Sequence, residues 1–191
     1  MKGYRKLRGI ILNYLKELPK NLTYHGYNHT MDVLNVCNQY IRRLHLTKEE
    51  RSLLRIAALS HDIGFVKSYI DHEEVGAEML ELHMKELNID PSYIAKLKKM
   101  IIATKPSNPA LTKLEKIICD ADLDYLGRSD FEPISKNLYK ELKNLGLIKS
   151  HDEWMELQIK FFETHEFQTP FAKKYRAPVK AKWLEKLKND Y

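Results

Sequence analysis

Three histidines stand on apolar helical stripes of the sequence, where they would face the protein interior. His29 lies four residues before Val33 on a stripe with the 3.6-residue period of a helix, and His61 continues the stripe of Leu54. His72 begins a third stripe of the same spacing. A single buried histidine is ordinarily a hydrogen-bonded core residue, but three on inward-facing stripes indicate a shared site.

Asp62 follows His61 within the strongly apolar stretch IAALSHDIGF. A carboxylate buried there as an ion needs a cation or a set of hydrogen-bond donors to compensate for its lost hydration. A divalent metal ion held by imidazoles and carboxylates meets this need. The chain has a second doublet, His151-Asp152, which follows a glycine-containing loop. We interpret that doublet as a solvated helix start, so the first one is the candidate for chemistry.

Aspartates also interrupt the apolar segment LEKIICDADLDYLGR. Asp122 and Asp124 lie on opposite rims of its helical stripe, and periodicity alone does not choose between them. Aspartate inside a helix competes for backbone hydrogen bonds and is costly to bury. We therefore expect one of the two aspartates to lie at the metal site. The alternative is that these aspartates cap a helix or pair with a nearby Lys or Arg.

The elements that position these residues are expected to be helices. Gly and Pro number only seven each in 191 residues, and no convincing alternation of period 2 occurs. Segments of about 12 to 20 residues with helical periodicity, separated by loop signals, predict about eight helices. We expect one all-α domain over residues 1–191, a helical bundle with a motif-bearing core at about 24–128 and C-terminal helices 129–191 packed onto it. Helix N-caps are predicted at Thr47, Asp71 and Asp90.

Composition narrows the class of protein. The net charge is +6, but residues 1–20 hold six Lys/Arg and one acid and residues 171–191 hold seven and two. We interpret these ends as solvated helical faces, so nucleic acid is not the expected partner. Cys37 and Cys119 are far apart, which argues against disulfides or a zinc finger. No signal peptide or spanning segment is visible, and we expect a cytoplasmic protein without a membrane partner.

The order of these motifs resembles the HD superfamily of metal-dependent phosphohydrolases, all-helical proteins named after the His-Asp doublet. The chain is most similar to its small predicted phosphohydrolases, which share a YH-x3-H start, an HE-rich helix after the doublet and a DADLxxLG segment. The similarity runs from about Tyr24 to Tyr175. It implies a fold of the HD-domain type and selects one aspartate of the DADLDYLG segment. The implied metal ligands are His29, His61, Asp62 and Asp122.

The segment YHGYNH is also similar to the YHNxxH segment of cyclic nucleotide phosphodiesterases, in which the first histidine protonates the leaving oxygen. On this analogy His25 is the candidate general acid. Gly26 stands where those enzymes carry Asn, and Phe65 stands where many of them place a further His after the doublet. The departure at Phe65 speaks against a two-metal site and against specific cyclic phosphodiesterase activity.

The expected activity is metal-assisted hydrolysis of a phosphate ester in a small, nucleotide-like substrate, as a phosphomonoesterase or phosphodiesterase. Two imidazoles and two carboxylates suit divalent Mn, Mg, Fe, Ni or Zn. Asp62 or Asp122 would position the water, and His25 or His72 would handle the proton. Candidates for binding the substrate phosphate are Lys67, Lys105 and Arg128.

Two other classes of function stay open at this point. A di-iron oxygenase on the same helical scaffold would use additional histidines near the site, and His72 is available for that role. A non-catalytic module that binds nucleotides or nucleic acid would use the basic ends of the chain. The sequence predicts no oligomeric state.

Overall fold

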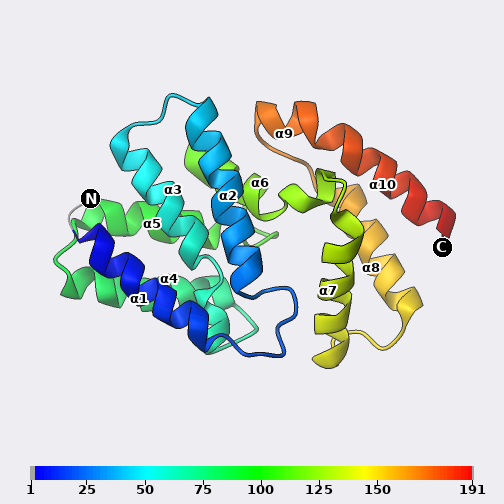
Figure 1. The fold of residues 1–191 in the computed structure, drawn as a ribbon, viewed down its shortest axis with the longest axis horizontal. Helices are drawn as coiled ribbons and strands as arrows, with labels where there is room; N and C mark the ends of the chain where they lie inside the picture. Colours follow the sequence, from blue (N-terminus) through cyan, green and yellow to red (C-terminus); the bar gives the residue numbers. More distant parts are fainter. Residues whose placement is uncertain (1–2, 191) are drawn as a thin grey trace. The chain divides into compact units, whose positions relative to one another are not determined.

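The computed structural model describes residues 3–190, and all regular structure in this range is helical (Figure 1). The prediction of an all-α fold is therefore confirmed. The chain folds as two compact units, one formed by Met1–Lys20 with His25–Asp122 and the other by Asn21–Tyr24 with Leu123–Tyr191. That both units belong to a single domain stays a prediction.

The first unit is organised around a central helix, α3, which contacts α1, α2, α5 and α6. The segment LLRIAALS of α3 is apolar on nearly every side, and a helix of this kind must be covered by neighbours. Ala57 and Ala58 are buried and small, so the adjacent helices approach closely. The helices of this unit are α1 (Tyr4–Glu17), α2 (Tyr27–Arg43), α3 (Lys48–Ser60), the 3₁₀ helix η1 (Ile63–Val66), α4 (His72–Glu86), α5 (Pro91–Ile102) and α6 (Lys113–Asp122).

All three predicted N-cap positions are confirmed, and two of the three residues form side-chain capping bonds. Thr47 forms a complete capping box with Glu50, and the carboxylate of Asp90 accepts a hydrogen bond from the backbone of Ser92. Asp71 is the N-cap residue of α4 as predicted, but it adopts the left-handed conformation with a φ of 54° and its side chain caps no backbone group. The Asp71 carboxylate instead binds the ammonium group of Lys105 at 2.6 Å.

The second unit contains a break in its C-terminal helical segment that the sequence analysis did not anticipate. Helix α9 ends before Arg176, and α10 begins with Pro178 in its first turn, where proline is tolerated. This break contributes to a total of ten α-helices in the described range, against about eight predicted. None of them is both long and apolar enough to cross a bilayer. The helices of this unit are η2 (Asp124–Gly127), α7 (Phe131–Asn144), α8 (His151–Thr164), α9 (Pro170–Tyr175) and α10 (Ala177–Asp190).

Aromatic side chains form the core of the second unit. The ring of Phe131 lies 5.0 Å from that of Phe162 and 5.2 Å from that of Trp183, measured between centroids. Gly127 packs directly on the backbone of Arg176, where a Cβ atom would come within 2.6 Å of the carbonyl oxygen. This glycine therefore allows η2 to lie against the junction of α9 and α10.

Candidate metal centre

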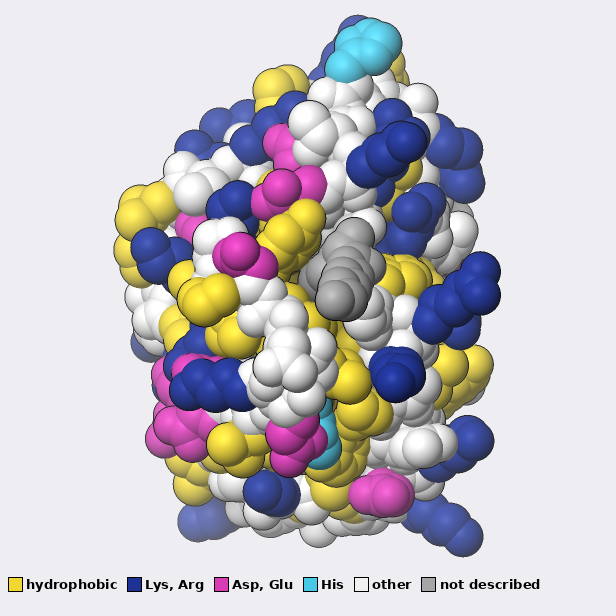
Figure 2. Space-filling model, turned by 90° about the vertical axis from the view of Figure 1, so that its left-hand side faces the viewer, with side chains coloured by type: hydrophobic (Ala, Val, Ile, Leu, Met, Phe, Trp, Pro, Cys, Tyr) yellow, Lys and Arg dark blue, Asp and Glu magenta, His cyan; other side chains and the backbone are white. Residues whose placement is uncertain are grey.

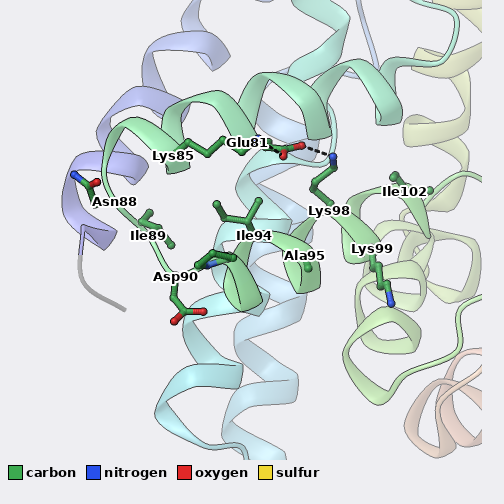
Figure 3. Close-up of a pocket in the computed structure, with 11 residues that line it drawn as sticks. Glu81, Lys85, Asn88, Ile89, Asp90, Ile94, Ala95, Lys98, Lys99 and Ile102 are labelled. Carbon is green, nitrogen blue, oxygen red and sulfur yellow. Dashed lines mark hydrogen bonds and ion pairs between the residues drawn. The ribbon is translucent and has the colours of Figure 1, made fainter.

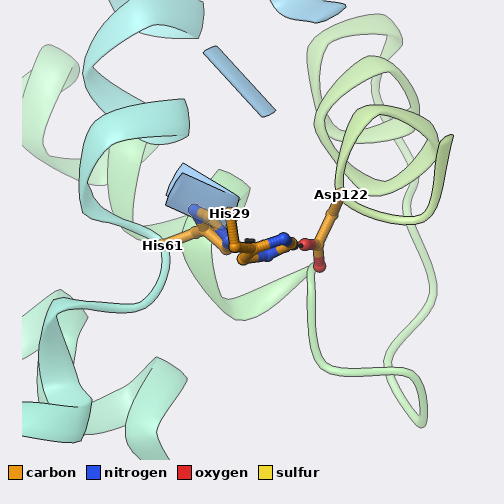
Figure 4. Close-up of side chains that lie close together, drawn as sticks. All are labelled: His29, His61 and Asp122. Atoms are coloured by element: carbon orange, nitrogen blue, oxygen red, sulfur yellow. Dashed lines mark hydrogen bonds and ion pairs between the residues drawn. The ribbon is translucent and has the colours of Figure 1, made fainter. Parts of the chain in front are cut away.

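Three side chains from separate helices of the first unit converge on one point (Figure 4). His29 comes from the first turn of α2, His61 follows α3, and Asp122 ends α6. The Asp122 Oδ1 atom lies 2.9 Å from His29 Nε2 and 3.3 Å from His61 Nε2. These three ligand atoms lie within 4.8 Å of one another, which is near enough to hold a metal ion.

Asp62 adds a second carboxylate to this group. Its Oδ2 atom lies 3.2 Å from His61 Nε2 and 3.5 Å from His29 Nε2. The residue is only 3% exposed, and Oδ2 is buried with no hydrogen-bond partner in the described part of the chain. An ionised oxygen in this state is costly unless a cation compensates for it. The donor set formed by His29, His61, Asp62 and Asp122, called the His/Asp cluster below, therefore fits a divalent ion.

The orientation of His61 suits metal binding. Its Nδ1 atom lies 3.0 Å from the carbonyl oxygen of Ala58, one turn back in the chain. When Nδ1–H donates to that carbonyl, the lone pair of Nε2 faces the cluster, which is the tautomer that a metal ligand requires. The helical stripe that placed His61 inside thus also supplies the carbonyl that orients its ring.

Charges within the His/Asp cluster shift its pKa values strongly. Burial by itself lowers the pKa of His61, but the carboxylates of Asp62 and Asp122 outweigh burial and raise that pKa well above its usual value. Burial by itself raises the pKa of the Asp62 and Asp122 carboxyls. The adjacent His61 imidazole outweighs burial, and the pKa of each carboxyl lies below its usual value, that of Asp62 well below it. In the metal-free protein, protons on imidazole therefore supply the positive charge that balances the two carboxylates.

The two proposed catalytic histidines, His25 and His72, lie beside the cluster, and both pack on one phenylalanine. The Phe65 ring stacks on His72 with centroids 3.8 Å apart and packs on His25 at 4.6 Å. His25 is also 5.9 Å from the His29 ring, and His72 Nε2 is 3.5 Å from Asp62 Oδ1. Both histidines thus belong to the surroundings of the cluster.

The three basic residues considered for phosphate binding have different surroundings. Lys67 is exposed at the end of η1 and forms no ion pair within the described residues. Lys105 is held by Asp71 at 2.6 Å and by Glu74 at 2.9 Å. Arg128 belongs to the second unit, where its guanidinium group binds Asp130 at 2.8 and 3.0 Å and lies 3.6 Å from Asp124.

The two aspartates that periodicity left open are separated by the structure. Asp122 closes α6 beside the imidazoles, whereas Asp124 belongs to the second unit. There it is 1% exposed, and its Oδ1 atom accepts a hydrogen bond of 2.7 Å from Arg176 Nε. Asp124 therefore pairs with a basic residue, which was the alternative to metal binding in the sequence analysis.

Sequence reasoning missed Glu73. This buried residue places its Oε2 atom 3.4 Å from His72 Nδ1. The run HEE shows two acids in the first turn of a helix, where acids are common, and nothing in the sequence distinguishes the buried Glu73 from the half-exposed Glu74.

A separate cavity of about 720 Å³ lies between α4 and α5 (Figure 3). Ile89 and Ile94 line it, together with Glu81, which forms ion pairs with Lys85 and Lys98 at the rim. The cavity includes no member of the His/Asp cluster. Over the surface seen in Figure 2, Lys and Arg side chains are interspersed with apolar ones.

Comparison with known proteins agrees with the geometry of the cluster. The family model of the HD domain matches residues 26–124, which span all four members of the His/Asp cluster and more than half of the chain. No curated protein and no solved structure matches the chain. The order of the histidines and aspartates, the helical fold and this match lead to one conclusion: the chain belongs to the HD domain family, whose members are generally metal-dependent phosphohydrolases.

Proposed function

We propose that this protein hydrolyses a phosphate ester of a small, nucleotide-like compound with the help of one divalent ion held by the His/Asp cluster. The observation that carries the proposal is the buried Asp62 Oδ2 atom, which has no hydrogen-bond partner in the described chain and lies within 3.5 Å of two imidazole nitrogens. Two nitrogen and two oxygen ligands suit Mn, Mg, Fe, Ni or Zn. A bound ion of this kind supplies Lewis acidity, which polarises a phosphoryl oxygen and lowers the pKa of a nearby water.

Phe65 supports one ion rather than two. Its ring packs on both neighbouring imidazoles, with centroids 4.6 Å from His25 and 3.8 Å from His72. This buried phenyl ring stands where a further histidine would be expected for a second ion, and it offers no ligand atom. We therefore favour the hydrolase over the di-iron oxygenase.

The remaining steps are assigned to residues of the first unit. His25 is partly exposed beside the cluster, so we propose that it donates the proton to the leaving oxygen as water attacks phosphorus. The carboxylates of Asp62 and Asp122 would orient that water. Lys67 is our first candidate for the substrate phosphate, because the ammonium group of Lys105 is already bound to two carboxylates. Arg128 stays a candidate from the second unit.

Metal content and turnover test the proposal together. Metal-free protein would be loaded separately with Mn²⁺, Mg²⁺, Fe²⁺, Ni²⁺ and Zn²⁺, and the bound ion measured by mass spectrometry. Each form would then be given p-nitrophenyl phosphate, bis-p-nitrophenyl phosphate and a panel of nucleotides, which separates monoesterase from diesterase activity. We expect one ion per chain and turnover that a chelator abolishes.

Three other results would each refute the proposal. Two irons per chain with oxygen consumption would identify an oxygenase. Salt-sensitive polynucleotide binding that a chelator does not affect, with no turnover, would identify a binding module. A chain that binds none of the five ions would leave the cluster without the proposed role.

A further inference from the structure

His72 lies between two carboxylates of the first unit. Its Nε2 atom is 3.5 Å from Asp62 Oδ1, and its Nδ1 atom is 3.4 Å from Glu73 Oε2. The carbonyl oxygen of Tyr69 is also 3.4 Å from Nδ1. The other carboxylate oxygen of Asp62 faces His29 and His61. A continuous series of polar contacts therefore runs from Glu73 through the imidazole to the His/Asp cluster.

The burial of Glu73 requires an explanation. The residue is 5% exposed, whereas the neighbouring Glu74 is half-exposed and binds Lys105. An acid in the first turn of a helix is favourable while it stays in water, so its helix position does not account for the burial. Glutamate is almost never fully buried without a partner, and within residues 3–190 Glu73 forms its ion pair with His72.

The surrounding backbone fixes the position of His72. Gly64 lies directly against the first turn of α4, so that a Cβ atom at this position would come 1.9 Å from the carbonyl oxygen of His72. On the other side, the Phe65 ring stacks on the imidazole at 3.8 Å with an interplanar angle of 18°. The ring therefore has little freedom to turn away from Asp62.

We infer that Glu73 is a positioning residue of the metal centre, which acts through His72 to hold Asp62 with its Oδ2 atom toward His29 and His61. This inference rests on the proposed function, because it assumes that Asp62 is a metal ligand. It gives His72 a positioning role and leaves the proton to His25. Residues that orient metal ligands through hydrogen bonds commonly change metal affinity by about 10- to 100-fold when they are replaced.

Glu73→Gln tests the inference against a matched control. The variant keeps the shape of the side chain but removes its charge, and Glu78→Gln makes the same change at an exposed position of the same helix. Calorimetric titration with Mn²⁺ should show an affinity about tenfold weaker for Glu73→Gln and unchanged for Glu78→Gln. Circular dichroism and thermal unfolding of the metal-free proteins establish that each variant is folded.

A double-mutant cycle distinguishes action through His72 from a general loss of structure. If Glu73 acts through His72, then Glu73→Gln has no further effect on Mn²⁺ affinity in a His72→Gln background. In metal-free protein, the imidazole ¹⁵N shifts of His72 should change in Glu73→Gln and stay unchanged in Glu78→Gln. The NMR measurement does not depend on metal binding, and the less disruptive Glu73→Asp would replace Glu73→Gln if the latter did not fold.

The outcomes separate this inference from the proposed function. Wild-type protein that binds Mn²⁺ together with a Glu73→Gln variant of equal affinity would overturn the positioning role alone. Equal losses in the Glu73→Gln and Glu78→Gln variants, or additive effects in the cycle, would also overturn it. Wild-type protein that binds no divalent ion would refute the proposed function, and the inference with it.

Discussion

The Nε2 atoms of His29 and His61 lie 3.3 Å apart, although 32 positions separate the two residues in the chain. The two nitrogens come from different helices and share Asp122 Oδ1 as a neighbour at 2.9 and 3.3 Å. Two lone pairs at this separation repel one another unless a proton or a metal ion lies between the rings. Helix packing in the first unit therefore creates a place for positive charge, which the two aspartates reinforce.

Replacing Asp122 should remove metal binding and turnover together. Asp122→Ala deletes an oxygen that lies within 3.3 Å of both imidazoles. Loss of a proposed ligand should cost at least as much as loss of a residue that only supports one, which is about 100-fold at the upper end. We expect at least that decrease in both metal affinity and kcat/KM, measured by calorimetry and by phosphate release.

Asp152→Ala is the matched control for this prediction. It removes an aspartate from the other His-Asp doublet, which lies exposed at the start of α8. Metal content and turnover should equal those of the wild-type protein. If Asp152→Ala abolished metal binding and turnover and Asp122→Ala did not, then the metal site would belong to the His151-Asp152 doublet instead.

Metal binding should release protons and should strengthen as the pH rises. Asp62 and Asp122 raise the pKa of His61 although burial opposes this, so the metal-free ring holds a proton at neutral pH. That proton must leave before Nε2 can bind a metal, and below the raised pKa it competes with the ion. Titrations at one pH in buffers of different ionisation enthalpy should show release of about one proton per metal ion. Heats that do not depend on the buffer would contradict this protonation state.

The sequence predicted the members of the cluster better than their surroundings. Helical periodicity placed His29 and His61 inside, because both stripes continue through a single helix. It failed to choose between Asp122 and Asp124 because α6 ends at the first and η2 begins at the second, so one helical wheel does not describe both. The resemblance to the HD superfamily selected Asp122, and the structure places this residue beside the two imidazoles.

The structural environment of His72 could not be predicted from the sequence. Asp71, which precedes His72, adopts the left-handed conformation, although the sequence there looks like an ordinary capping box. The Asp71 side chain forms an ion pair with Lys105, which is 34 positions later in the chain. Gly64 approaches the backbone of His72 in the same turn, and the buried Glu73 is paired with that histidine. Local propensity carries no information about such long-range contacts.

Acid should destabilise the second unit through His165. Burial lowers the pKa of this ring from 6.5 to about 4, and the ammonium group of Lys180 adds to the effect. Between these values the unfolded chain binds a proton that the folded chain does not, so stability is complete above pH 6.5 and falls as the pH falls toward 4. From pH 7 to pH 5 the loss from this group should be up to about 2 kcal/mol.

His165→Phe should remove this part of the pH dependence. The variant keeps the aromatic packing against Phe161 and Phe167 but cannot be protonated. Denaturant unfolding at pH 7 and pH 5, followed by tryptophan fluorescence, reports on this unit because both tryptophans of the chain lie in α8 and α10. The exposed His151→Gln serves as the control and should behave like the wild-type protein. If His165→Phe lost as much stability as the wild-type protein between these pH values, another group would be responsible.

Asp124 should prove to be a structural residue and not a metal ligand. Its buried carboxylate accepts a hydrogen bond from Arg176 Nε at 2.7 Å, and removing one partner of a buried ion pair leaves the other uncompensated. Asp124→Ala should therefore lower the unfolding free energy reported by tryptophan fluorescence by about 3 kcal/mol. Metal affinity under native conditions should stay within about twofold of the wild-type value, because neither oxygen belongs to the His/Asp cluster. If Asp124→Ala unfolded like the wild-type protein but no longer bound metal, then Asp124 and not Asp122 would be the metal ligand.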